Sequence, residues 1–452
     1  MTKLAYERPV ITKLNTGLMN KFGTRTEFTP TTHIDGVPVK KLIADFGSPC
    51  FILSERTLRD TYKNNVMAFK TRYPKVQFAW SYKTNYFDAV CNIFHQEGSW
   101  AEVVSIFEYE KALKNGVPGE KIIFNGPHKS EDDLKQAIKN NSLIHIDHFD
   151  ELYTLSEILK TTKTKARVAI RVNMDTGVYP IWDRFGFNYE NGSAWNAINK
   201  IFTHPEMELV GLHSHIGTYM LSANPYAVAT SKLCDLAFNI KKSYGKVIEY
   251  LDLGGGFATA NTLKGSYLQG GDIIPSIDDY AEAITNTILN YGFKTDELPT
   301  LFLETGRAMI DDAGYLLGSV LAIKRLNDGR RATVMNFGVN LLFTSFWYDH
   351  RISPAQEVSS QTEDMVLYGP LCMNIDVVRE SVNLPLLNKG DDVVVHRVGA
   401  YNMTQWMQFI QMRPKVVLIG MDGTPHIIRE NEDVNTMLKY EKLPKHLSEF
   451  KL

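Results

Sequence analysis

The sequence has 452 residues, of which 44% are hydrophobic and 22% charged, and its 31 glycines and 18 prolines fall in no low-complexity run. This composition is typical of a globular protein with a large core, and it excludes a disordered, collagen-like or coiled-coil chain. The 49 basic and 51 acidic residues leave a formal net charge of -2. No charge excess therefore indicates binding to nucleic acid or to an anionic membrane, and a small-molecule ligand is expected.

The cysteines and the N-terminal segment indicate a reduced, cytoplasmic protein. The four cysteines form neither a CxxC pair nor a closely spaced disulfide framework: Cys50, Cys91, Cys234 and Cys372. The start, MTKLAYERPVITKL, has no apolar run before a cleavage site. No stretch approaches the roughly 18 apolar residues of a membrane-spanning helix, so we expect no membrane association.

Eight short, apolar, β-branched runs recur between residues 76 and 307, and each is followed by a polar or glycine-bearing turn and a helix-like stretch. The runs are VQFAWSY (76–82), AEVVS (101–105), KIIFNG (121–126), LIHID (143–147), ARVAIRVN (166–173), ELVGLHSHIG (208–217), VIEYLDLGGG (247–256) and TLFLETGR (300–307). Intervening segments such as 129–140 and 277–290 have apolar residues at helical spacing. Eight βα units predict a closed (β/α)8 barrel, whose active site is built at the C-terminal ends of its strands.

Beyond about residue 310 the pattern changes to strand-rich segments separated by turns such as NDG, KGDD and MDGTP. This part is predicted to form an antiparallel β domain. A short strand signal also occurs in FTPTTHIDGVPVKKLI, before the barrel, and we expect it to pack on the β domain. The predicted division is a barrel over residues 46–310 and a β-sandwich or barrel-like domain from residues 1–45 and 311–452.

Polar residues with catalytic potential follow several of these strands. Lys83 ends the first strand, where a partly desolvated ammonium would have a lowered pKa suited to Schiff-base formation. Taken alone, such a lysine is more often a surface residue whose stem lies on apolar neighbours. Glu304 ends the eighth strand, where a carboxylate could keep a heteroaromatic nitrogen protonated or could simply pair with Arg307.

Glycines after the last two strands indicate an anion site. Gly254, Gly255 and Gly256 would let backbone N–H groups approach a phosphate, and Gly306 with Arg307 adds a second anion-binding element beside them. A tight turn would explain the three glycines equally well. The loops after strands seven and eight are, however, the usual phosphate site of such barrels.

For two histidines and two other residues, the sequence allows both a structural and a functional role. His213 and His215 lie on one face of a strand, which also suits a metal site. Only Asp252 is a nearby carboxylate, so we expect no metal and assign one ring to stacking on a planar cofactor. Cys372 and Tyr401 fit core packing, and Tyr401 also fits phosphate binding.

In order and spacing, these motifs resemble the fold-type III pyridoxal-phosphate decarboxylases, the family of diaminopimelate, ornithine and arginine decarboxylases, with an alanine racemase-like fold. The resemblance covers nearly the whole chain. It rests on HIDGVPVKKLIADFGSPCFIL, SYKTN, VVSIFEYEKAL, IIFNGPHKS, RVN, DRFGF, GLHSHIGT, LDLGGGF, LETGR, YGPLC and VGAY.

The resemblance implies a role for each matching residue. Lys83 would bind pyridoxal phosphate covalently, His215 would stack on its ring, and Glu304 would pair with the pyridine nitrogen. The phosphate would be bound by Thr218, Gly254, Gly255, Gly256, Gly306, Arg307 and Tyr401. The family forms head-to-tail homodimers with shared active sites, so Cys372 would donate a proton in the partner's site. The implied reaction removes the α-carboxylate of an amino-acid substrate.

Departures from the family pattern lie in the substrate pocket that the resemblance implies. Met373 and Phe337 replace acidic residues, Thr344 and Ser345 replace an Arg-Pro pair before Tyr348, and Thr305 replaces a proline. A buried ammonium without its carboxylate costs several kcal/mol, so free ornithine or lysine would bind poorly. We therefore expect a conjugated amino acid from a siderophore- or antibiotic-type pathway.

Three alternatives remain at this point. A racemase or another lyase would use the same cofactor, and a catalytically silent pseudo-decarboxylase would bind partners. A metal hydrolase is the third. Retention of Lys83, Glu304, Arg307 and Cys372 favours the decarboxylase.

Overall fold

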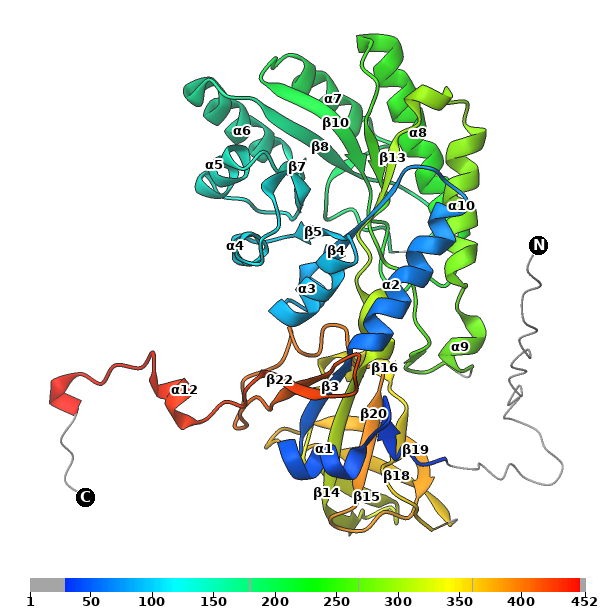
Figure 1. The fold of residues 1–452 in the computed structure, drawn as a ribbon, viewed down its shortest axis with the longest axis vertical. Helices are drawn as coiled ribbons and strands as arrows, with labels where there is room; N and C mark the ends of the chain where they lie inside the picture. Colours follow the sequence, from blue (N-terminus) through cyan, green and yellow to red (C-terminus); the bar gives the residue numbers. More distant parts are fainter. Residues whose placement is uncertain (1–28, 179, 267, 360, 448–452) are drawn as a thin grey trace.

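The computed structural model describes residues 29–178, 180–266, 268–359 and 361–447, and it contains the predicted barrel (Figure 1). Eight parallel strands close into one sheet because the sixth, β10, pairs with both β8 and β11. The strands are β4 (Val76–Ser81), β5 (Trp100–Val103), β6 (Ile122–Phe124), β7 (Leu143–Ile146), β8 (Ala166–Asn173), β10 (Met207–His213), β11 (Tyr250–Asp252) and β13 (Thr300–Leu303). Six of them fall within the predicted runs, and β5 and β10 each begin one residue before theirs.

Most helices of this domain cover the outside of the barrel, whereas the short α9 (Gly270–Ile273) lies toward the β domain and α11 (Arg307–Ile310) begins at Arg307, which lines a cavity (Figure 1). The others are α2 (Glu55–Lys70), α3 (Asp88–Gln96), α4 (Ile106–Lys114), α5 (Glu131–Lys139), α6 (Phe149–Thr162), α7 (Ser193–Phe202), α8 (Asn224–Tyr244) and α10 (Ile277–Asn290). Capping boxes at Ser130 and Ser276 begin α5 and α10, because each serine side chain accepts a hydrogen bond from the N–H of the residue three positions on. None of the described helices is long and apolar enough to cross a membrane.

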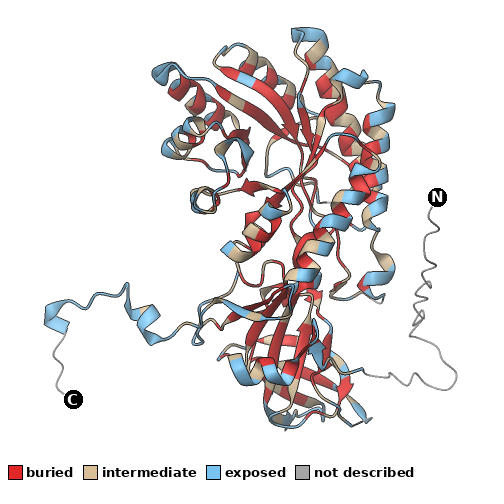
Figure 2. Ribbon diagram, viewed as in Figure 1, coloured by how far each residue is buried: buried red, intermediate tan, exposed pale blue. Residues whose placement is uncertain are grey.

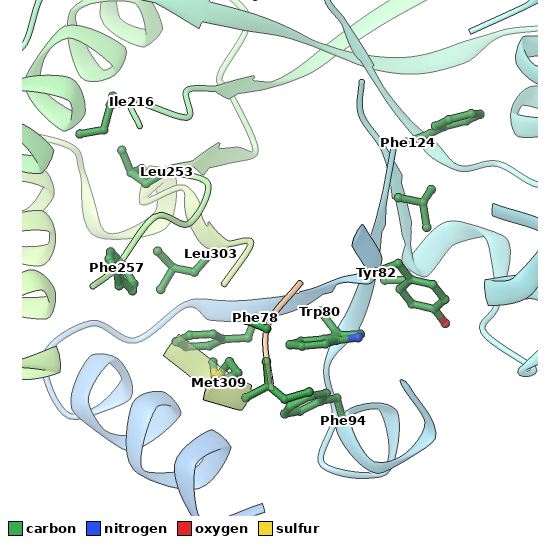
Figure 3. Packing of buried hydrophobic residues seen from close by; sticks show 14 of the residues in the cluster. Phe78, Trp80, Tyr82, Phe94, Phe124, Ile216, Leu253, Phe257, Leu303 and Met309 are labelled. Atoms are coloured by element: carbon green, nitrogen blue, oxygen red, sulfur yellow. The ribbon is translucent and has the colours of Figure 1, made fainter. Parts of the chain in front are cut away.

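The core lies inside the barrel and between its strands and helices, and the barrel strands are buried along nearly their whole length (Figure 2). Figure 3 shows Phe78 and Trp80 of β4 directed toward Phe94 of α3, and the Trp80 and Phe94 rings stack with centroids 4.1 Å apart. Inside the barrel, Tyr250 fills the space beside Gly211, where any Cβ would clash with its ring. These packed layers hold the strand ends in fixed positions.

The second domain is built mainly from strands, as predicted. Its strands are β3 (Cys50–Ser54), β14 (Gly314–Arg325), β15 (Arg331–Met335), β17 (Ile352–Pro354), β18 (Thr362–Tyr368), β19 (Val377–Pro385), β20 (Asp392–His396), β21 (Val416–Ile419) and β22 (Pro425–Arg429). Most of its pairings are antiparallel, but β15 pairs with β18 and β3 with β21 in parallel. The expectation of a purely antiparallel sheet is therefore wrong at these two pairs.

The chain leaves the β domain for the barrel later than the predicted boundary at residue 46. Strand β3 lies within the range assigned to the barrel, yet it pairs with β14 and β21. Before it, the hairpin β1 (His33–Ile34) and β2 (Val37–Pro38) and helix α1 (Val39–Phe46) pack on the same domain, with Ile34, Val37, Val39 and Leu42 in one buried cluster with residues of β3, β14 and β21. The part of the predicted N-terminal segment in residues 1–28 lies outside the described residues.

Candidate active site

A cavity of about 330 Å³ opens at the C-terminal ends of the barrel strands. Eight of the predicted site residues line it: Lys83, His215, Thr218, Gly256, Glu304, Gly306, Arg307 and Tyr401. Seven of them follow β4, β10, β11 and β13, while Tyr401 comes from the β domain. Closure of the barrel and packing of the β domain against its end thus bring residues as far apart in the sequence as Lys83 and Tyr401 to one cavity.

Lys83 lies in a short 3-10 turn (Tyr82–Thr84) directly after β4 and faces Glu102 of β5. Its Nζ donates to both carboxylate oxygens of Glu102, at 3.0 and 2.9 Å, and Ser81 Oγ donates to the same carboxylate. Glu102 is fully buried, whereas 39% of the Lys83 side-chain surface is accessible because that side chain faces the cavity. The amine is therefore held in one place and open to a ligand.

The pKa of Lys83 differs in direction from the sequence-based expectation. Burial lowers it, but the negative charges of Glu102 and Glu304 together outweigh burial and raise the pKa above its ordinary value. Desolvation, on which the expectation of a lowered pKa rested, is the largest single effect, but the contributions that raise the pKa exceed it together. Glu102 was not among the predicted site residues, although it lies within the second predicted strand, AEVVS (101–105).

Glu304 extends from the end of β13 and is 5% exposed. Asn125, which follows β6, donates from Nδ2 to Glu304 Oε1 at 2.7 Å, and His213 Nε2 lies 3.3 Å from Glu304 Oε2. Burial lowers the pKa of His213 well below its usual range, which keeps its ring neutral. The carboxylate is therefore oriented by neutral groups and remains able to pair with a cation in the cavity.

Four buried side chains meet beneath this cavity: His145, His213, Asp252 and Glu304, whose possible ligand atoms lie within 4.8 Å of one another. From the sequence, Asp252 was expected to be the only nearby carboxylate, and His145 was not predicted. Its presence depends on β7 and β10 meeting around Glu304, which the sequence does not show. Burial, with the charge of Glu304, raises the pKa of Asp252 well above its usual range. The expectation that no metal ion binds here stays a prediction.

The glycines after β11 and β13 form a cradle that side chains would fill. A Cβ on Gly254 would lie 2.6 Å from His215 Nδ1, and one on Gly255 would lie 2.5 Å from the Glu304 carbonyl oxygen. The Gly255 N–H donates to His215 Nδ1 at 3.1 Å, which sets the orientation of that ring. Only glycine fits this closely packed backbone, and Gly256 and Gly306 line the same cavity as the Arg307 guanidinium, whose positive charge suits a phosphate group.

Arg307 completes this anion site. Its guanidinium lies over the ring of Tyr401, 5.0 Å from the centroid, and its Nη1 donates to Asp311 at 3.3 Å. Its buried Nε has no hydrogen-bond partner among the described residues. The residues present thus fit pyridoxal phosphate, with an amine at Lys83, a carboxylate for the ring nitrogen and an unsatisfied donor for the phosphate.

Strand β8 and the segment after it supply cavity residues for which no role was predicted from the sequence. Arg171, Trp182, Arg184 and Phe185 all line the cavity. The Trp182 ring lies 5.3 Å from the His215 ring, and the Arg171 guanidinium lies 4.5 Å from the centroid of Phe185. The strings RVN and DRFGF marked this segment only through the resemblance, because no local pattern shows that the loop folds over the cavity.

Besides Gly254 and Gly255, five predicted residues are not among those lining the cavity of the single chain that the structure describes. Phe337 is buried in the β-domain core against Gly318, and Thr344 is buried with hydrogen bonds to His350 and Asn402. The remaining three are Tyr348, which lies under the Arg307 guanidinium, Cys372, which is exposed, and Met373 beside it. Their roles as substrate-pocket or proton-donor residues stay predictions.

Comparisons with known proteins agree with this geometry. Residues 59–311 match the family model of the pyridoxal-dependent decarboxylases, pyridoxal binding domain. The chain is 31% identical to the diaminopimelate decarboxylase of Methanocaldococcus jannaschii over 92% of its own length and 95% of that protein, and 26% identical to that of Bacillus subtilis over 90% and 94%.

Solved structures give the same result. The crystal structure of the M. jannaschii enzyme with L-lysine has a TM-score of 0.84 to this chain, at 30% identity, and the match covers 92% of this chain and 96% of the other. A Helicobacter pylori diaminopimelate decarboxylase complexed with L-lysine has a TM-score of 0.78 at 24% identity, and the match covers 88% of this chain and 98% of the other. At this identity it supports the fold alone. The chain matches the family model, and one cavity holds an amine, a carboxylate and an anion site. This chain therefore belongs to the fold-type III pyridoxal-dependent decarboxylases and is a pyridoxal-phosphate-dependent amino-acid decarboxylase.

Proposed function

We propose that the protein removes the α-carboxylate of an amino acid whose distal amine is conjugated, in a specialised biosynthetic pathway of the siderophore or antibiotic type. The proposal rests on which charged residues line the cavity and which of them already have partners. Its two lining carboxylates, Glu102 and Glu304, already contact Lys83 on one side and Asn125 with His213 on the other. No carboxylate among the described lining residues is left for a distal ammonium.

The groups around the free part of the cavity favour an uncharged or anionic distal group. Trp182, Phe185 and Val104 offer apolar surface, while Arg171 and Arg184 offer positive charge. A free ammonium would be desolvated beside two guanidinium groups without a partner, at a cost of several kcal/mol. Met373 supports the same conclusion if a second chain contributes it, whereas Phe337 does not, because it packs in the β-domain core.

The residues of the chain have distinct tasks in this reaction. Bound pyridoxal phosphate supplies an electron sink for the electron pair that departing carbon dioxide leaves behind. Glu304 would hold a proton on the ring nitrogen, His215 would restrict the tilt of the ring, and Arg307 with the glycine cradle would hold the phosphate. Lys83 would anchor the cofactor and exchange its amine for that of the substrate.

The proton returned to the substrate carbon would come from Cys372 of a second copy. Cys50, Cys91 and Cys234 are buried, and Cys372 is exposed. A thiol at the surface of one β domain can enter the cavity of another chain in a homodimer with shared sites.

Two inactive variants test this arrangement. Lys83→Ala removes the amine that a chain supplies to its own site, and Cys372→Ala removes the thiol that a chain supplies to its partner's site. A dimer with one chain of each variant still contains one site in which both residues are intact. Mixing the two should therefore restore about one quarter of wild-type activity, which is the share of intact sites after random exchange of subunits. Mixtures that stay as inactive as the separate variants would contradict a shared site.

The substrate is tested by incubating the protein, supplied with pyridoxal phosphate, with two sets of compounds and following carbon dioxide by mass spectrometry. One set is free diaminopimelate, lysine and ornithine, and the other is the same diamino acids acylated at the distal amine. Release from the acylated set alone is expected. Release from a free diamino acid at a comparable rate would refute the distal-group argument, and racemisation without release would favour a racemase.

A further inference from the structure

Asp311 is a buried carboxylate directly after α11, and it is not among the residues that line the cavity. Nothing in the proposed reaction uses it. Four donors converge on its two oxygens: Thr259 Oγ1 at 2.7 Å, Asn261 Nδ2 at 3.1 Å and Arg307 Nη1 at 3.3 Å on Oδ2, and the Ala400 N–H at 3.2 Å on Oδ1. A buried carboxylate costs free energy unless donors surround it, so these contacts keep Asp311 in place.

The four donors belong to three separate parts of the anion site. The first two lie in the loop that begins with the glycines at 254–256, after β11. Arg307 supplies the positive charge of the site, and Ala400 directly precedes Tyr401 of the β domain. One buried carboxylate therefore joins the glycine loop, the guanidinium and the β-domain segment across the boundary between the two domains.

The orientation of the Arg307 guanidinium depends on Asp311. The rings of Tyr348 and Tyr401 lie 4.8 and 5.0 Å from the guanidinium carbon, but ring contacts do not decide which nitrogen faces the cavity. Among the described residues, the carboxylate of Asp311 is the acceptor for Nη1, while the buried Nε has no partner. Because a guanidinium presents its donors in a rigid fork, fixing Nη1 also fixes the direction of the donors that are left for a ligand.

The backbone at Tyr401 also needs fixed contacts. Its φ of 66° lies in the left-handed region, which a residue with a side chain adopts only at a cost in free energy. Two hydrogen bonds hold this conformation: the Ala400 N–H donates to Asp311, and the Tyr401 N–H donates to the Thr84 carbonyl at 2.9 Å. A Cβ on Gly399 would lie 2.0 Å from the last carbonyl oxygen of α11, so this segment packs directly on the end of that helix.

We propose that Asp311 is a positioning residue for the phosphate of the cofactor, an inference that rests on the phosphate role proposed for Arg307. It holds the guanidinium and the backbone at Tyr401 in the geometry that receives the phosphate. The negative charge of Asp311 by itself has the opposite effect, because it repels a phosphate and offsets part of the Arg307 charge. Removal of that charge therefore weakens phosphate binding if positioning dominates, and strengthens it if charge dominates.

The test compares pyridoxal phosphate with pyridoxal, which has the same ring and aldehyde but no phosphate. The cofactor-free, full-length protein is titrated with each compound, and the absorbance of the ring bound at Lys83 gives the two dissociation constants. The test variant is Asp311→Asn, whose amide cannot accept hydrogen bonds at both of its ends. The matched control is Asp312→Asn, which removes the same charge from the next residue, where a 58% exposed carboxylate pairs with Arg397.

In Asp311→Asn, the dissociation constant of pyridoxal phosphate should rise at least about tenfold, while that of pyridoxal should stay within about twofold of the wild type. In the control, both constants should stay within about twofold. Unchanged or tighter binding of pyridoxal phosphate, or an equal loss for both compounds, overturns the proposal. If Asp311→Asn does not fold, Thr259→Val decides: it removes one donor to Asp311 and should give a smaller loss for pyridoxal phosphate alone, and no such loss overturns the proposal.

The phosphate role of Arg307 is tested separately with Arg307→Gln. This variant should also lose affinity for pyridoxal phosphate and keep that for pyridoxal. If it binds the two compounds in the wild-type ratio, the phosphate role is refuted, and the proposal for Asp311 with it. If Arg307→Gln shows the phosphate-specific loss and Asp311→Asn does not, only the proposal for Asp311 is refuted. Neither measurement depends on which amino acid the protein decarboxylates.

Discussion

The ion pair between Lys83 and Glu102 gives the sharpest prediction, because it sets the reactivity of the amine that we propose binds the cofactor. At 2.9 Å, two unit charges attract by about 1.4 kcal/mol in a water-like medium and by about 6 kcal/mol at an effective dielectric constant near 20. Because 39% of the Lys83 side chain is accessible, screening places the effect near the lower value. Glu102→Gln should therefore lower the pKa of Lys83 by about 1 to 2 units.

Only the neutral amine attacks an aldehyde, so the rate of cofactor capture by the cofactor-free protein at pH 7 should rise about 10- to 100-fold in Glu102→Gln. Stopped-flow absorbance across pH measures both the rate and the midpoint of its profile. Glu108→Gln is the matched control, since Glu108 is also buried but accepts the Val104 N–H instead of contacting Lys83. A profile for Glu102→Gln that matches the wild type would refute this account of the Lys83 pKa.

Three further predictions follow from other buried groups. Glu304→Gln should keep the cofactor but slow turnover by about 10² to 10³, measured in single-turnover carbon dioxide release, and fast release would reject the ring-nitrogen role. Burial lowers the pKa of His350 to about 3, so between about pH 6.5 and 3 only the unfolded chain takes up this proton, and the free energy of unfolding decreases by about 1.4 kcal/mol for each unit that the pH is lowered. In urea unfolding, the pH dependence of this free energy should be shallower by that amount in His350→Gln, and equal slopes would contradict the prediction. Lys129→Met should cost about 3 to 5 kcal/mol in the same assay because it leaves the buried Glu151 unpaired, and a loss below 1 kcal/mol would show that this pair is dispensable.

Much of the site was predictable because it lies at strand ends. The end of a barrel strand is fixed by the local apolar pattern, and a side chain there faces the cavity whatever the details of packing. Lys83, Glu304 and the glycines at 254–256 and 306 could therefore be identified before any contact was known.

The residues that were missed act through neighbours on other strands. Asn125 and Arg171 carry no local signal, and their contacts with Glu304 and Phe185 depend on the order and register of β6, β8 and β13 in the closed sheet. Phe337 shows the reverse case, since a residue aligned with a pocket position packs into the β-domain core. Strand β3 likewise gives no sign in its sequence that it joins β14 and β21.

The sequence by itself determined the alternation of eight strands and helices, the strand-rich second domain and the identity of the reactive groups, because these depend on periodicity and residue chemistry along a short stretch of chain. The tertiary structure decided which of those groups meet and in what charge state. Lys83 is the plainest example: its position is local, but its raised pKa comes from Glu102 and Glu304, which barrel closure brings beside it. Electrostatic energy depends on distance and burial, and neither is contained in sequence spacing.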